Sequence, residues 1–157
     1  MDKLEVQKRV LKNGEPLSLD DFIWDEKTNT FSSVENSLVL DFNWIHDCTF
    51  NTDYDCTFHT GFGCTFKIND YKFPIAPLRF NGSRYYIEVS GPSLIRSGCI
   101  EKPVKWWQEN IKRCAEENSY TPGQVKEYEF YVEILAKWLD RFGKEIQVTN
   151  KPEQGGK

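Results

Sequence analysis

The segment from Asp47 to Asp70 constrains this chain more than any other, because it contains one octapeptide written three times. The copies begin at Asp47, Asp55 and Gly63, and each has Cys-Thr-Phe at its second to fourth positions. Tandem copies of a short unit indicate a repeat architecture, in which stacked units bury a continuous core. A repeat is therefore expected to organise at least this part of the chain.

The alternation inside each copy predicts which side chains point inward. Cys and Phe are two residues apart, so on a strand they share one face. The opposite face carries a residue that changes from Asn51 to His59 to Lys67. We expect Cys and Phe to lie inside and the variable residue to lie in solvent.

Each octapeptide is too short to enclose a filled core alone, since eight extended residues span at most about 28 Å. Each copy is expected to form one strand and one turn, either half a coil of a solenoid or one strand of a meander. Three copies are few for a stable stack, so the flanking segments are expected to act as caps.

The segments on either side of the repeat predict further helices and strands. Residues 2–12 predict a helix that ends at Asn13-Gly14. Residues 37–44 predict a strand with Leu38, Leu40, Phe42 and Trp44 on one inward face. After residue 77, strands are expected over 78–80, 84–90 and 93–100, and a helix is expected to begin near Pro103. Thr121, Pro122 and Gln124 predict a capped helix that runs from Pro122 to Phe142.

Together these signals predict an α+β fold. Its N-terminal half would be a short, solenoid-like β-stack built on the repeat, followed by a small antiparallel sheet and a C-terminal helix pair. The expected regions are 1–72 with the repeat, 73–149 with the hairpin and two helices, and 150–157 as a flexible tail.

Composition indicates a cytoplasmic protein. No apolar run approaches the roughly 20 residues of a membrane helix, and no signal peptide follows Met1. The five cysteines are an odd number, which argues against a closed disulfide framework and favours a reduced compartment.

Charge is distributed unevenly along the chain. Residues 1–70 carry 6 basic and 13 acidic side chains, a net charge of −7, whereas the remainder carries +3. An acidic face on the repeat half could bind a cationic groove of a partner, in the manner of a nucleic-acid mimic. The candidate residues on this half are Asp41, Asp47, Asp53, Asp55, His59 and Asp70.

The cysteines raise two chemical alternatives. Cys48, Cys56 and Cys64 with the two histidines could bind zinc, but their spacing of eight lacks the usual Cys-x2–4-Cys pair. His46-Asp47-Cys48 could be a thiol nucleophile with its base, but the repeat already requires Cys48 for packing. We expect a buried thiol ladder, with no metal, no cofactor and no catalytic residue.

The C-terminal half raises the question of partners. Basic residues that could bind nucleic acid are interspersed with glutamates, so direct nucleic-acid binding is not expected. Trp106 is a candidate contact residue beside the core residue Trp107. The last helix is apolar on more than one side, and Phe130, Ile134 and Trp138 lie in line as a candidate homodimer surface.

Tandem Cys-Thr-Phe-x-Thr-Gly octapeptides resemble those of a family of bacterial and phage repeat proteins for which no shared activity is known. The resemblance extends to Arg9–Leu17, Trp24–Ser32 and Leu38–Phe42. It implies a phage or mobile-element origin more than a particular chemistry.

We therefore expect a non-enzymatic protein that binds a host macromolecule, for example by inhibiting a bacterial defence complex in an anti-CRISPR-like manner or a nucleic-acid-processing enzyme. The alternatives are a phage structural or assembly component, and a thiol- or metal-dependent enzyme.

Overall fold

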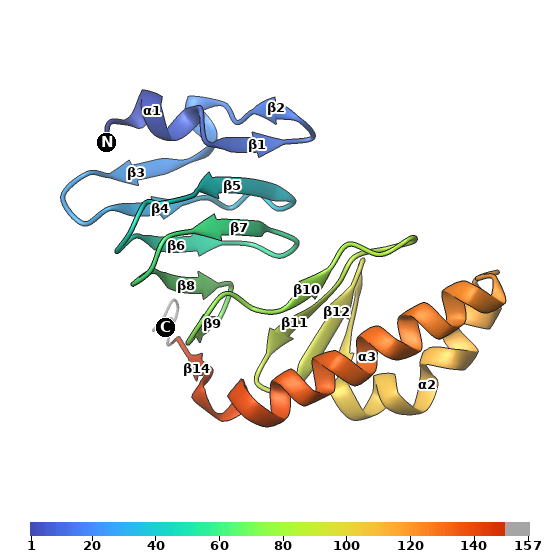
Figure 1. The fold of residues 1–157 in the computed structure, drawn as a ribbon. Helices are drawn as coiled ribbons and strands as arrows, with labels where there is room; N and C mark the ends of the chain where they lie inside the picture. Colours follow the sequence, from blue (N-terminus) through green and yellow to red (C-terminus); the bar gives the residue numbers. More distant parts are fainter. Residues whose placement is uncertain (150–157) are drawn as a thin grey trace, which may run out of the picture. The chain divides into compact units, whose positions relative to one another are not determined.

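The computed structural model describes residues 1–149 and divides into two compact units. Of the described residues, the first unit contains Met1–Ala76 and 147–149, and the second contains Pro77–Ile146. The chain is α+β, with several small sheets and a helical C-terminal region (Figure 1). The expected second region of 73–149 differs from this division at both ends, because residues 147 and 148 pair with a strand of the first unit. The predicted tail lies outside the described residues.

Two sheets form most of the first unit. Sheet A has the strand order β2-β1-β5-β7, with β2 at Glu15–Pro16, β1 at Val10–Lys12, β5 at Leu38–Phe42 and β7 at Thr57–Thr60. Sheet B has the order β14-β9-β8-β6-β4-β3, with β14 at Gln147–Val148, β9 at Tyr71–Phe73, β8 at Thr65–Ile68, β6 at Thr49–Thr52, β4 at Thr30–Ser32 and β3 at Ile23–Asp25. The helix α1 (Lys3–Gln7) and the 3₁₀ helix η1 (Leu19–Asp21) complete the described part of the unit.

The three octapeptides alternate between these sheets. The first and third copies form β6 and β8, which pair in parallel in sheet B with Phe50 opposite Phe66. The second copy forms β7, which pairs in parallel with β5 in sheet A. A meander would make neighbouring strands antiparallel, so the parallel pairing excludes that alternative for the repeat.

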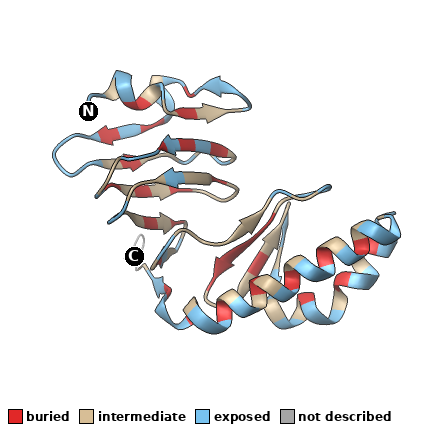
Figure 2. Cartoon of the chain, in the orientation of Figure 1, coloured by how far each residue is buried: buried red, intermediate tan, exposed pale blue. Residues whose placement is uncertain are grey.

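Phenylalanine rings from the two sheets interleave in the core. Phe50 of sheet B lies 5.0 Å from Phe42 and 5.5 Å from Phe58 of sheet A, measured between ring centroids. Cys48, Cys56 and Phe66 are also buried, and His59 is exposed. Buried positions, in red, recur along the strands of this unit (Figure 2). The predicted inward placement of Cys and Phe is confirmed, although Phe58 and Cys64 are only half-buried.

The predicted N-terminal helix over 2–12 is wrong beyond Gln7. Helix α1 is capped by Asp2 and Glu5, but Val10 begins strand β1 and packs in the core. Asn13 and Gly14 both have positive φ, 53° and 80°. That combination suits a tight hairpin turn, so Asn13-Gly14 joins β1 to β2 rather than ending a helix.

Trp44 does not continue the inward face of β5, contrary to the prediction. The strand ends at Phe42, where the amide of Ile45 donates to the Phe42 carbonyl and closes a turn. Trp44 has a φ of 66° and its side chain is 86% exposed. The alternation that predicted its burial stops with the strand.

The second unit is an antiparallel sheet with two helices packed on it. Sheet C has the order β10-β11-β12-β13, with β10 at Arg79–Phe80, β11 at Ile87–Gly91, β12 at Leu94–Ser97 and β13 at Ile100–Pro103. The helices are α2 (Val104–Glu117), α3 (Pro122–Phe142) and the short 3₁₀ helix η2 (Gly143–Glu145). The predicted bounds of α3 and its capping box of Thr121 and Gln124 are confirmed.

Hydrogen bonds from buried aromatic side chains hold the helices to sheet C and to the segment that precedes β11. The Trp107 indole donates to the Ile95 carbonyl at 2.8 Å, and the Tyr128 hydroxyl donates to the Tyr85 carbonyl at 2.6 Å. Gly143 allows a close backbone approach, because a Cβ there would lie 2.7 Å from the Pro92 carbonyl oxygen. Among residues 1–149, no helix has the length and apolar character needed to cross a membrane.

Candidate functional site

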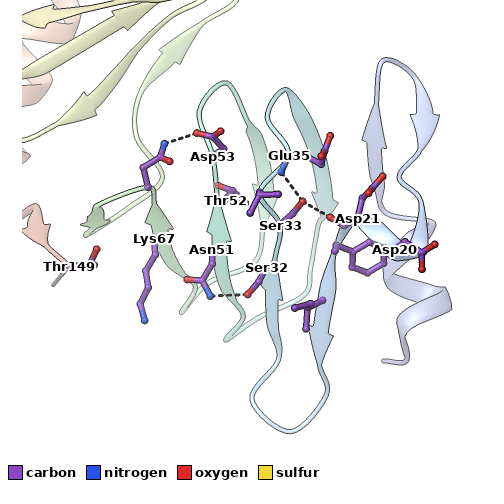
Figure 3. A pocket seen from close by; sticks show the side chains of 14 residues that line it. Asp20, Asp21, Ser32, Ser33, Glu35, Asn51, Thr52, Asp53, Lys67 and Thr149 are labelled. Carbon is purple, nitrogen blue, oxygen red and sulfur yellow. Dashed lines mark hydrogen bonds between the residues drawn. The ribbon is translucent and has the colours of Figure 1, made fainter. Parts of the chain in front are cut away.

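A groove of about 690 Å³ lies on the outer face of sheet B (Figure 3). A row of side chains at one register on four neighbouring strands crosses it: Ile23, Ser32, Asn51 and Lys67. Their neighbours along the strands point into the core, so strand alternation itself turns this row outward. At a strand spacing of about 4.8 Å, the row is roughly 14 Å long.

Hydrogen bonds hold the lining side chains in place. The Asn51 amide donates to the Ser32 hydroxyl at 3.0 Å, and the Asn69 amide donates to the Asp53 carboxylate at 2.8 Å. Asp53 and Asn69 occupy the same position of the first and third octapeptides, so the repeat places them side by side. The Ser33 hydroxyl donates to the Asp21 carbonyl at 2.7 Å, which ties the segment after β4 to η1.

The groove carries more negative than positive charge. Among residues 1–149, four carboxylates line it, from Asp20, Asp21, Glu35 and Asp53, against one ammonium, that of Lys67. Glu35 already forms an ion pair with Lys12 at 2.8 Å. Figure 3 shows Lys67 on one side of the groove and Asp20 and Asp21 on the other. Asp20 and Asp21 therefore form an acidic end of the groove at η1, whereas Asp53 lies beside Asn69, near Lys67.

The carboxylates of the groove are spread along it rather than gathered at one point. Across residues 1–149, no three His, Cys, Asp or Glu side chains lie close enough together to hold a metal ion. The arrangement suits an extended partner that carries several charges better than a single cation.

Only one of the predicted acidic contact residues lines this groove, namely Asp53. Asp47 lies at the other end of β6, where a Cβ on Gly63 would collide with its carboxylate. Asp55 accepts a hydrogen bond from the Ser37 hydroxyl at 2.8 Å. His59 lies on the outer face of sheet A, at the same register as Asp41. The structure thus separates residues that the sequence grouped by charge.

The predicted contact residues of the second unit lie on two helices, Trp106 on α2 and the other three on α3. Trp106 is half-buried against Trp107, with ring centroids 5.1 Å apart. On α3, Phe130 is 54% exposed, whereas Ile134 and Trp138 are half-buried.

The sequence did not reveal the acidic end of the groove. Asp20, Asp21 and Glu35 come from segments outside the repeat, and no periodic signal links them to it. The sequence does show which lining residues occupy equivalent positions of the first and third octapeptides: Asn51 with Lys67, and Asp53 with Asn69. They could have identified part of the lining once the first and third copies were known to be neighbours.

Cys48 does not have the environment of a nucleophile. Burial, followed by the nearby Cys64 and Asp47, raises the pKa of the Cys48 thiol to about 11, so it stays protonated at neutral pH. The neighbouring His46 accepts a hydrogen bond on Nδ1 from the Phe62 amide at 3.0 Å and stacks on the Phe62 ring. This side chain is therefore engaged with the turn after β7. All five cysteines are free thiols.

Three arginines of the second unit, Arg79, Arg96 and Arg113, are paired with glutamates of the same unit. Guanidinium-to-carboxylate distances are 3.4 Å for Arg79–Glu88, 3.9 Å for Arg96–Glu101 and 3.3 Å for Arg113–Glu117. Such pairs reduce the positive potential that phosphate binding needs.

The chain matches no protein-family model, no curated protein and no solved structure. Its function therefore has to be argued from its own geometry.

Proposed function

We propose that this protein is a non-enzymatic binding protein whose groove on sheet B holds a positively charged segment of another protein. The observation that carries the proposal is the acidic end of the groove. Asp20 and Asp21 are exposed, and within residues 1–149 their carboxylates form no hydrogen bond or ion pair. They are free to accept charge-assisted hydrogen bonds from lysine or arginine side chains.

The rest of the groove suits an extended peptide. Ser32 and Asn51 can exchange hydrogen bonds with peptide groups, and Lys67 favours a carboxylate at the far end. The volume of about 690 Å³ lies within the range typical of ligand pockets, about 300–1,000 Å³. The two carboxylates at η1, which are unpaired within residues 1–149, favour binding with the most basic part of a segment at that end.

The partner class follows from the charge of the groove. Enzymes and defence complexes that handle nucleic acid present cationic surfaces to phosphates. A positively charged segment of such a surface can lie in the acidic groove. We therefore propose a host defence or nucleic-acid-processing protein as the partner, in the bacterial cytoplasm. The resemblance to phage repeat proteins supports this setting. Direct binding of nucleic acid is disfavoured by the acidic lining, and a thiol enzyme by the protonated Cys48.

We interpret the octapeptide region as a short solenoid-like stack that serves as the scaffold for this groove. The parallel pairing of β6 with β8 supports this interpretation. It places residues opposite each other that are sixteen positions apart in the sequence, the length of two octapeptides. The alternative role, a phage structural or assembly component, would show as ordered self-assembly of the purified protein.

Charge reversal at the acidic end is expected to abolish most of the binding of a cationic peptide. We expect the double change Asp20→Lys and Asp21→Lys to weaken binding of a lysine-rich octapeptide at least tenfold, about 1.4 kcal/mol. Fluorescence anisotropy of the labelled peptide at low salt measures the dissociation constant.

The matched control is the double change Glu15→Lys and Glu26→Lys, which alters net charge equally at exposed positions outside the groove. Its affinity should stay within about twofold of the parent. Equal weakening by both double variants would show that only net charge matters, and would remove the groove from the proposal.

We also propose that α3 mediates a homodimer through Phe130, Ile134 and Trp138. These residues are spaced by four along the helix, so they form one stripe. The nearby ion pair of Glu133 with Lys137 offers both charges to a second copy. We expect Ile134→Glu to convert a dimer to a monomer, because a carboxylate would be buried at the centre of the contact. Light scattering over a range of concentrations measures the mass, and a monomer mass for the parent would contradict the dimer.

A further inference from the structure

The second unit contains a cavity of about 260 Å³ that the proposed function does not use. It lies between the turn that joins β12 to β13, helix α2 and the start of α3. Its most deeply buried lining residues are Trp107, Ile111, Ala115 and Tyr128. Within the part of the chain that the structure describes, no lysine, arginine, aspartate or glutamate lines it.

The polar atoms of these buried residues are already engaged. The Trp107 indole donates to the Ile95 carbonyl at 2.8 Å. The Tyr128 hydroxyl donates to the Tyr85 carbonyl at 2.6 Å and accepts from the Arg84 amide at 2.9 Å. These four residues therefore offer a ligand mainly ring and aliphatic surface, while Ser97 and Asn118 add polar groups elsewhere in the lining. The buried part favours an apolar occupant over water.

Two further aromatic residues on the more exposed part of the lining are held in position by the fold. The Arg84 guanidinium carbon lies 4.3 Å from the Tyr120 ring centroid. Arg84 also donates to the carbonyls of Asn118 at 3.3 Å and Ser119 at 3.4 Å. The backbone of Tyr85 is tied to α3 through its carbonyl, although the Tyr85 ring itself is 60% exposed. The Tyr120 ring is therefore the more firmly positioned of the two.

We propose that this cavity binds a small, uncharged, planar aromatic molecule of one or two rings. An apolar cavity of about 150 Å³ is enough to hold benzene. At about 260 Å³, this cavity has room for a fused two-ring molecule, and the rings of Trp107, Tyr120 and Tyr128 offer stacking and edge contacts. A charged ligand would lose its hydration without finding a counter-ion among the lining residues.

Two cysteines in the lining allow the proposal to be tested on the unmodified protein. Cys99 is exposed and Cys114 half-buried, and both line the cavity. Indole is the probe, and alkylation by iodoacetamide is followed at each cysteine by peptide mass spectrometry. The alkylation rate at Cys114 should fall by the factor 1 + [indole]/Kd. The dissociation constant obtained from this decrease should equal the one measured by calorimetry.

Three comparisons decide the outcome. Cys64 of the first unit, also half-buried, should keep its rate, and indole-3-carboxylate should give no protection. Cys114→Phe should fill the cavity and abolish the calorimetric signal, with a thermal melt to verify folding. Unchanged Cys114 rates up to the solubility limit of indole, or equal protection of Cys64, would overturn the proposal.

Discussion

Replacing Phe50 with alanine is expected to lower the free energy of unfolding by about 3–5 kcal/mol. The ring is fully buried, at 0% exposure, where the two sheets of the first unit meet. It lies 5.0 to 5.7 Å from the rings of Phe42, Phe58 and Phe66. Truncation would remove ring contacts on several sides and leave a cavity that the two sheets cannot close.

Phe58→Ala is the matched control, because Phe58 occupies the same position of the next octapeptide. Its ring is only half-buried, and β7 is the last strand of sheet A. We expect roughly half the loss found for Phe50, since less apolar surface returns to water. Urea unfolding followed by circular dichroism measures both values. Equal losses at the two positions would contradict the different burial of the two rings.

Replacing Tyr128 with alanine is expected to have a comparable effect on the second unit, about 3–5 kcal/mol. The side chain is 1% exposed and packs on the rings of Tyr120 and Tyr131. Its hydroxyl bridges the Tyr85 carbonyl and the Arg84 amide, so it joins α3 to the strand side of the unit.

Tyr128→Phe separates the contribution of the hydroxyl from that of the ring. We expect a loss of about 1–3 kcal/mol, because a carbonyl and an amide lose their partner. Tyr131→Phe is the control: its hydroxyl donates to Glu127 at 2.6 Å, but Glu127 keeps its bonds to Ser83. Urea unfolding followed by circular dichroism compares the free energies of unfolding of these variants. A Tyr128→Phe protein as stable as the parent would mean that the bridge contributes nothing.

Local patterns in the sequence correctly predicted two parts of the fold. The octapeptide places strands at Thr49–Thr52, Thr57–Thr60 and Thr65–Ile68, because Cys and Phe alternate with polar residues at the period of a strand. The bounds of α3 follow from the Thr121 capping box and from Gly143, which are local signals. Each of these depends only on residues within one or two turns of the chain.

Other local patterns were misleading because tertiary partners decided the outcome. Val10 has helical spacing to Val6, yet pairing with Leu40 draws it into sheet A. Trp44 continues the alternation of β5, yet a turn at Phe42 turns it out to solvent. The eight-residue period also does not predict which sheet each octapeptide joins. Half a coil of a solenoid and one strand of a meander would both show the same alternation of apolar and polar residues.

The candidate sites depended on the tertiary structure most of all. The groove joins Asp20 and Asp21 to Asp53 and Lys67, and the cavity joins Tyr85 to Cys99, Trp107 and Tyr128. The repeat determined that Asn51 and Lys67 face outward and that Asp53 and Asn69 are equivalent. The parallel pairing of β4, β6 and β8 is what places these side chains next to each other. Residues distant in sequence become neighbours through strand order, which no local preference of the chain determines.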